Sequence, residues 1–178
     1  MDRYMKRALE LAHEAYDEGE VPVGAVVVKK TTGEIIGEGR NRRETAKNAL
    51  AHAEIEAIDA ACKRLGGWRL PECAIYVTLE PCPMCCGAII NARIDDVIFG
   101  AYDHKSGSVV SVQKMFEHPY NHFPKVEGGV MEEECGLILS EFFRSLRLKH
   151  KQRREESATS ELQPETELET IEQTITRR

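Results

Sequence analysis

Two short motifs, His-Ala-Glu at residues 52–54 and Pro-Cys-Pro-Met-Cys at residues 81–85, constrain this chain more than any other feature. One imidazole and two thiolates, from His52, Cys82 and Cys85, supply three corners of a zinc tetrahedron, and a catalytic zinc site keeps its fourth corner for water. Glu54 is a poorer zinc ligand than sulfur or nitrogen, but a carboxylate two residues from a ligand is well placed to move protons. We therefore predict a catalytic zinc centre with Glu54 as its general acid/base.

Both motifs are expected at the start of a helix. The strand expected over residues 75–79 ends before Pro81, and Cys82 then precedes a proline at the first helical position. His52 opens a second helix, whose apolar stripe continues to Gly66. The positive end of a helix dipole lowers thiol pKa values, which helps cysteines bind zinc as thiolates. The sequence thus predicts two helix N-termini directed at one metal ion.

A single Cys-x-x-Cys pair also occurs in redox proteins and as one half of a zinc ribbon. The chain has no second pair of this spacing, and the His-x-Glu motif supplies the remaining groups, so the catalytic interpretation is favoured. The other four cysteines show no ligand spacing, and we interpret them as small buried hydrophobic residues. They are Cys62, Cys73, Cys86 and Cys135.

The order of the expected elements indicates the α/β class. An amphipathic helix within residues 1–20 comes before a hairpin of two strands, and a strand over residues 96–101 follows the helix of the second motif. A strand-helix-strand crossover of this kind favours a parallel strand pair. A last strand near residues 126–129 and a helix from Glu132 to about Lys151 complete the series. We expect a three-layer α/β/α sandwich around a mixed sheet of about five strands.

The end of the chain has a different composition. Residues 155–178 hold seven glutamates against two arginines and lack aromatic residues, so we expect a disordered acidic tail after a folded domain of residues 1–154. Most of the net charge of −6 belongs to this tail, so the overall acidity does not argue against a nucleic-acid partner. A basic cluster before the tail is either a phosphate-binding stripe or a solvated helix end that complements the helix dipole. It comprises Arg144, Arg147, Lys149, His150, Lys151, Arg153 and Arg154.

The cellular setting follows from what the chain lacks. No run approaches the roughly 20 apolar residues of a membrane span, and the charged first residues do not form a secretory signal. Unpaired cysteines beside a zinc motif are typical of a reducing compartment. We expect a cytoplasmic protein without membrane contact.

The two motifs resemble those of the zinc-dependent nucleobase and nucleoside deaminases. Six further segments narrow the resemblance to the bacterial tRNA-specific adenosine deaminases over roughly residues 1–150, and the tail has no counterpart in that pattern. These segments are residues 21–25, 37–41, 78–81, 99–107, 118–119 with 121–122, and 142–144. Two details depart from the pattern: Cys86 stands where a small residue is more usual, and the segment between His118 and Asn121 is short.

The resemblance implies a cytidine deaminase-like fold and hydrolytic conversion of adenosine to inosine at the wobble position of a tRNA anticodon. It also implies a homodimer with one zinc ion per subunit and RNA contacts from both subunits. Zinc would be held by His52, Cys82 and Cys85, and Glu54 would carry protons.

The resemblance further implies a set of substrate contacts. Asn41 and the backbone at Ala53 resemble groups that read the flipped base. Asp103 and Lys105 resemble contacts to the anticodon sugar-phosphate, although the residues alone favour a turn-forming role for Asp103. The other candidates for RNA contact are Phe143 and Arg144 from the last helix and, more weakly, His118, Asn121 and Asn48.

Three functions from different classes remain open at this point. An RNA-editing hydrolase would use a zinc-acidified water, whose pKa falls from about 15.7 toward 7, with Glu54 passing one proton to the ring nitrogen and a second one to the departing amine. A deaminase of free guanine or cytosine would use the same four residues in a different pocket. A non-catalytic zinc protein that docks RNA would have no need of Glu54.

Overall fold

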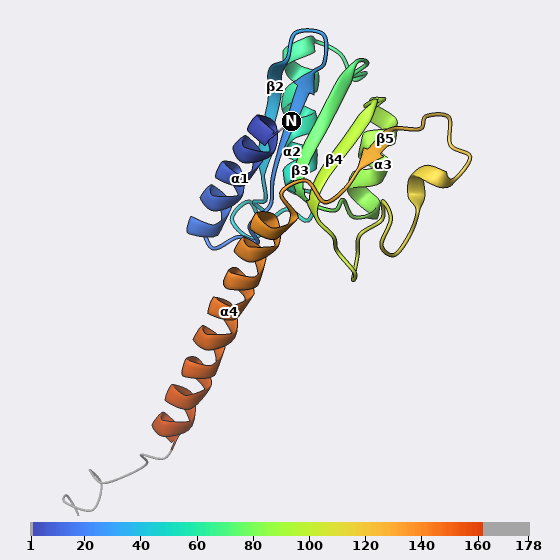
Figure 1. The fold of residues 1–178 in the computed structure, drawn as a ribbon. Coiled ribbons are helices and arrows are strands. Elements are labelled where there is room, and N and C mark those ends of the chain that lie inside the picture. The colour runs from blue at the N-terminus through green and yellow to red at the C-terminus, as the bar shows by residue number, and fades with distance from the viewer. Residues whose placement is uncertain (1, 162–178) are drawn as a thin grey trace, which may run out of the picture. The chain divides into compact units, whose positions relative to one another are not determined.

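The computed structural model describes residues 2–161, and its strands form one sheet in the order β2-β1-β3-β4-β5 (Figure 1). The strands are β1 (Gly24–Lys29), β2 (Glu34–Arg40), β3 (Cys73–Leu79), β4 (Asp96–Ala101) and β5 (Lys125–Glu127). The helices are α1 (Asp2–Asp17), α2 (Ala53–Leu65), α3 (Pro83–Ala92), the 3-10 turn η1 (Met115–Glu117) and α4 (Glu132–Glu161).

The sheet is mixed, as predicted. Strand β1 pairs antiparallel with both β2 and β3, whereas β3, β4 and β5 run parallel to one another. Helix α3 makes the crossover between β3 and β4, which explains why these two strands are parallel. The crossover leaves the carboxyl ends of β3 and β4 at the same edge of the sheet, next to the start of α3.

Alternate side chains of the central strands face two different helical layers. On β1, Val26 and Val28 belong to one buried cluster with Met5 of α1. Val27, between them, belongs to a second cluster that includes Ala57 of α2 and residues of α3. This period of two is what a strand covered on both faces requires, and it confirms the three-layer α/β/α sandwich (Figure 1).

Helix α4 begins at the predicted residue but extends to Glu161 instead of ending near Lys151. Glutamate, lysine and arginine are good helix formers, and Lys151 pairs with Glu155 one turn later at 3.8 Å. Residues 155–161 are therefore helical, where we had expected the disordered tail to begin. The rest of the expected tail, residues 162–178, lies outside the described residues.

The chain divides into two compact units, residues 1–142 and 143–178, and the first contains the whole sheet. The domain boundary expected after residue 154 stays a prediction. Among the described helices, none is both long and apolar enough to cross a membrane.

Helix α2 lies so close to β2 that two glycines of the strand have no room for a side chain. A Cβ atom at Gly39 would lie 2.2 Å from the carbonyl oxygen of Ala53, and one at Gly37 would lie 2.2 Å from that of Ala57. The first of these contacts is made at the first residue of α2. The strand therefore fixes the position of the helix start that carries His52 and Glu54.

We predict that Gly37→Ala lowers the free energy of unfolding by about 1–3 kcal/mol, because the helix and the strand must separate to admit the methyl group. Gly136→Ala in α4 is the matched control, since its Cβ meets nothing within 4 Å. Alanine in a helix interior is more stable than glycine by roughly 0.5–1 kcal/mol, so the control protein should gain stability. Urea unfolding of both variants measures the difference, and equal shifts would contradict the close approach.

Candidate metal centre

Three potential metal-binding side chains come together from the starts of two helices. His52 is the N-cap residue of α2 and Cys82 that of α3, and both have extended backbone angles. Cys85 follows in the first turn of α3, behind a proline at the first helical position. The Nδ1 atom of His52 lies 3.7 Å from Sγ of Cys82 and 3.6 Å from Sγ of Cys85. The helix starts thus converge as the sequence predicted.

This arrangement fits a tetrahedral zinc ion. Zinc–sulfur bonds of about 2.3 Å and zinc–nitrogen bonds of about 2.0 Å place tetrahedral sulfur and nitrogen ligands about 3.5 Å apart. The ligand atoms of the three residues all lie within 4.8 Å of one another. Within the described part of the chain, no other cluster of three His, Cys, Asp or Glu residues meets this criterion. The donor set of one nitrogen and two sulfurs is also one that zinc prefers.

The two thiols differ sharply in proton affinity. A hydrogen bond from Cys85, assisted by one from His52, lowers the pKa of Cys82 to about 4. The same contact with Cys82, together with burial, raises the pKa of the Cys85 thiol. The pKa of His52 is raised, chiefly by its hydrogen bond to Cys82. Zinc is bound by thiolates and a neutral imidazole, so metal binding to this hydrogen-bonded group would release protons.

Glu54 lies beside these atoms, in the first turn of α2. The residue is 4% exposed, and this burial raises the pKa of its carboxyl, while a hydrogen bond with Cys85 acts more weakly in the opposite direction. A carboxyl with a raised pKa can both accept and release a proton near neutral pH. His52 and Glu54 are only two residues apart, but both side chains contact Cys85 because they lie at the start of the helix.

The remaining cysteines lie apart from this group. Cys86 is fully buried, and its Sγ atom is 3.5 Å from the carbonyl oxygen of Pro81. Cys73 and Cys135 are also fully buried, which confirms the prediction that they are small hydrophobic residues. Cys62 is only partly buried, so the prediction is wrong in degree for this residue.

Asn41 is buried at the end of β2, where its side chain meets a carboxylate that the sequence analysis missed. The amide nitrogen of Asn41 donates to the carbonyl oxygen of Val21 at 3.2 Å and lies 3.5 Å from Oε2 of Glu20. Glu20 is 1% exposed and accepts the backbone N–H groups of Glu44 and Thr45. It thereby anchors the loop that leads into α2. Nothing in the sequence distinguishes Glu20 from an exposed glutamate.

Asp103 forms the tight turn that follows β4. Its Oδ1 atom accepts the backbone N–H groups of Lys105 at 2.9 Å and Ser106 at 3.3 Å. Burial alone would raise the pKa of Asp103, but the hydrogen bond from the Ser106 hydroxyl, together with these backbone bonds, outweighs it and holds the pKa below its usual range. The turn-forming role favoured by the residues alone is therefore present. Lys105 is exposed beside the turn.

The other candidate substrate residues lie in several different elements. Ala53 is buried as the first residue of α2, next to His52. Phe143 and Arg144 belong to α4, within the second unit. Asn121 accepts a hydrogen bond from Arg93.

The two weakest candidates lie in loops. Asn48 accepts the backbone N–H of Leu50 at 3.0 Å, just before α2. His118 directly follows the 3-10 turn η1 and is exposed. The contact of Asn48 is with its own loop, so by itself it does not point to a ligand.

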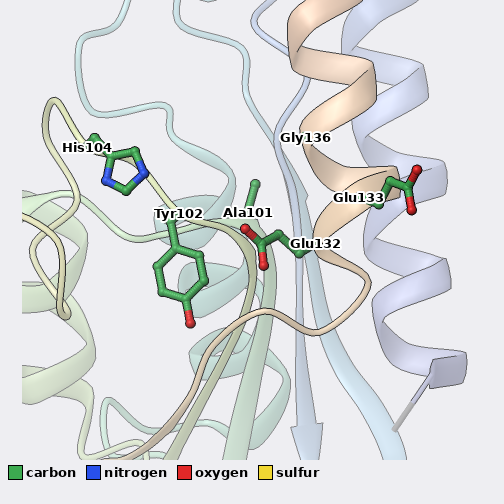
Figure 2. A pocket seen from close by; sticks show the side chains of 6 residues that line it. All are labelled: Ala101, Tyr102, His104, Glu132, Glu133 and Gly136. Atoms are coloured by element: carbon green, nitrogen blue, oxygen red, sulfur yellow. The ribbon is translucent and has the colours of Figure 1, made fainter.

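A separate hollow of about 470 Å³ lies where β4 ends and α4 begins (Figure 2). It is lined by Ala101, Tyr102, His104, Glu132, Glu133 and Gly136. Figure 2 shows the carboxylate of Glu132 near the Tyr102 ring, whereas that of Glu133 points to the other side of the helix. None of the three metal-site residues lines this hollow, and two glutamates make it unsuited to a phosphate.

Comparison with known proteins places the chain among deaminases. The model of the MafB19-like deaminase family matches residues 1–147. The tRNA-specific adenosine deaminase of Bacillus subtilis (strain 168) is 51% identical over 149 residues, which cover 83% of this chain and 91% of that protein.

Two solved structures show the same likeness at the level of the fold. One, from a study of A-to-I editing by tRNA:A34 deaminases at the wobble position of transfer RNA, has a TM-score of 0.75 and 43% identity over 78% of this chain and 100% of its own. The guanine deaminase of Bacillus subtilis has a TM-score of 0.54 and 36% identity over 82% of this chain and 92% of its own. Of these two, the tRNA deaminase is the more similar by both measures.

Proposed function

Since the chain belongs to the family of tRNA-specific adenosine deaminases, we propose that it hydrolyses adenosine to inosine and ammonia at the wobble position of a tRNA anticodon. The observation that carries this proposal is the convergence of His52, Cys82 and Cys85 with a buried glutamate beside them. A redox pair or a zinc ribbon would have no use for that glutamate. The identity of 51% to a tRNA-specific enzyme supports tRNA as the substrate.

We propose that His52, Cys82 and Cys85 hold one zinc ion per subunit. When bound, zinc supplies an acidified water, whose pKa falls from about 15.7 toward 7. Glu54 accepts the proton of this water and delivers it to the ring nitrogen next to C6, which makes that carbon electrophilic. Once the water oxygen has added to C6, the same carboxylate would take the second proton from the new C6 hydroxyl and deliver it to the amine, so that the C6–N bond breaks and ammonia leaves as the C6=O bond forms. Because Glu54 is 4% exposed, bulk solvent competes little for this proton.

The substrate contacts are proposed from the family and from local geometry. The side-chain nitrogen of Asn41 is engaged by Val21 and Glu20, which leaves its Oδ1 atom as an acceptor for a donor group of the nucleoside. The backbone at Ala53 is the second base-reading group. We propose that Asp103 and Lys105 meet the anticodon sugar-phosphate, joined by Phe143 and Arg144 of α4. An exposed lysine such as Lys105 suits a phosphate contact.

We further propose that the enzyme is a cytoplasmic homodimer with RNA contacts from both subunits. The family supports the dimer, and the six free cysteines suit a reducing compartment. Sedimentation velocity of the full chain measures the oligomeric state, and a monomer at the concentrations used for activity would contradict this part of the proposal.

The substrate is tested by incubating the zinc-loaded protein with bulk bacterial tRNA, followed by digestion to nucleosides and mass spectrometry. We expect inosine from tRNA and no ammonia from free adenosine, guanine or cytosine in parallel reactions. Ammonia released only from a free base would assign the chain to small-molecule deamination, the function of the guanine deaminase that is 36% identical.

A further inference from the structure

Glu80, the residue after β3, is a buried carboxylate that the proposed chemistry does not use. It is 2% exposed and accepts five hydrogen bonds from one loop. Its Oε1 atom accepts the backbone N–H groups of Val109 at 3.1 Å, Val110 at 2.8 Å and Ser111 at 2.9 Å. Its Oε2 atom accepts the backbone N–H of Asp103 at 3.1 Å and the hydroxyl of Ser111. One carboxylate thus gathers both ends of the loop formed by residues 102–111.

The backbone of Glu80 and Pro81 bonds to the end of β4 and to the same loop, next to the metal centre. The N–H of Glu80 donates to the carbonyl oxygen of Ala101 at 2.9 Å, and the N–H of Ser108 donates to that of Pro81 at 2.8 Å. Pro81 is followed directly by Cys82. The loop is therefore held against the turn that carries a candidate zinc ligand.

At Gly107 the loop lies so close to Glu80 that no side chain would fit there. A Cβ atom at Gly107 would lie 2.4 Å from Cδ and 2.4 Å from Oε2 of Glu80. The carboxylate is thus enclosed by backbone, and donors converge on both of its oxygens.

Five converging donors explain why a charged group is stable at this buried position. Burial disfavours a carboxylate, but backbone N–H groups aimed at its oxygens compensate for the lost water. Glutamine has one acceptor oxygen, which would serve the three N–H groups of residues 109–111. Its NH₂ group would then face the N–H of Asp103, and two donors repel. The structure therefore has a specific need for a carboxylate where the loop meets Asp103.

We propose that Glu80 is a positioning residue, which sets the loop of residues 102–111 relative to the metal centre so that Asp103 and Lys105 meet the RNA backbone at a fixed distance from it. The proposal rests on the proposed function, because it takes this loop to contact tRNA. Glu80 itself touches no substrate. It acts through the Asp103 turn, and its loss should weaken RNA binding more than chemistry.

The first test is Glu80→Gln, assayed on an anticodon stem-loop RNA. We expect KM to rise about tenfold, kcat to fall less than about threefold, and the zinc content to stay the same. In a double-mutant cycle with Asp103→Ala, the double variant should be no worse than the worse single variant, because both changes release the same turn. The proposal would be overturned if the increases in KM caused by Glu80→Gln and Asp103→Ala multiplied in the double variant. It would also be overturned if Glu80→Gln lowered kcat and left KM unchanged.

The second test, amide hydrogen exchange, needs no substrate. In Glu80→Gln the N–H groups of residues 103 and 109–111 should exchange at least about tenfold faster, while those of α2 keep their protection. Ser111→Ala removes one hydrogen bond to Oε2 of Glu80 and should raise the exchange rates of the same N–H groups by a smaller factor. If Glu80→Gln does not fold, the exchange rates of Ser111→Ala decide the test. Glu10→Gln, at an exposed position of α1, is the control and should change neither KM nor exchange. Unchanged loop exchange in both test variants would overturn the proposal.

The two experiments separate failure of this inference from failure of the proposed function. If the unaltered protein forms no inosine from RNA, the proposed function is wrong, and hydrogen exchange still decides whether Glu80 holds the loop. If inosine forms but Glu80→Gln matches the unaltered protein in KM and exchange, only the inference is wrong.

Discussion

Glu54→Ala should bind zinc as well as the unaltered protein and lose about 10²- to 10⁴-fold in kcat on tRNA, the contribution typical of a positioned acid/base. Zinc retention is expected because the three candidate ligands stay in place. The loss of turnover is expected because Glu54 is the buried carboxyl that forms a hydrogen bond with Cys85 beside the other candidate ligands. Metal analysis after dialysis and single-turnover kinetics measure the two effects separately.

Stability gives an independent check on the Glu54 variant. Burial raises the pKa of the Glu54 carboxyl, which means that its charged form lowers the free energy of unfolding. Its removal should therefore leave the free energy of unfolding unchanged or higher, so that lost activity cannot be ascribed to unfolding. Glu56→Ala, two residues further along α2, is the matched control and should keep kcat within about twofold. A Glu54→Ala protein with more than a tenth of normal kcat would show that another group moves the proton.

The fold and the placement of the two motifs follow largely from local signals. A proline after Cys82 defined the start of α3, and Gly66 ends α2 in a left-handed conformation with φ of 68°. Strand β4 has the bounds that the sequence predicted. These signals are short-range, because caps and strand alternation depend on residues within one or two turns. The convergence of the motifs then depends on two longer-range placements, because the β3-α3-β4 crossover positions Cys82 and Cys85 whereas the packing of α2 on β2 positions His52.

The two anchoring glutamates could not be predicted because their partners are distant in sequence. In the sequence, Glu80 indicated only the end of a strand. In the structure it accepts hydrogen bonds from residues 103 and 109–111. Glu20 likewise holds residues 44 and 45 of a loop more than 20 positions away. A carboxylate becomes buried only where folding brings several donors to it, and hydrophobic periodicity carries no information on that. The end of α4 was missed for a different reason, since charged residues suit both helices and tails.

Cys85→Ala should lose bound zinc and, with it, all measurable deamination. Removing one of the three proposed ligands should weaken zinc binding by more than the roughly 10–100-fold that is typical for loss of an outer-shell partner. Cys86 stands next in the sequence but cannot replace the lost ligand, because its Sγ atom faces the carbonyl oxygen of Pro81 and burial raises its pKa. Zinc content after dialysis against a mild chelator measures the loss.

Cys86→Ala is the matched control for this prediction, since it removes an adjacent thiol that is equally buried. It should keep stoichiometric zinc and its activity, with a loss of roughly 1 kcal/mol in the free energy of unfolding from the small cavity. The pair of variants thus separates loss of a ligand from loss of a buried sulfur. If Cys86→Ala lost zinc while Cys85→Ala kept it, the helix start of α3 would present its ligands one residue later than the structure shows, and the assignment of the metal centre would have to change.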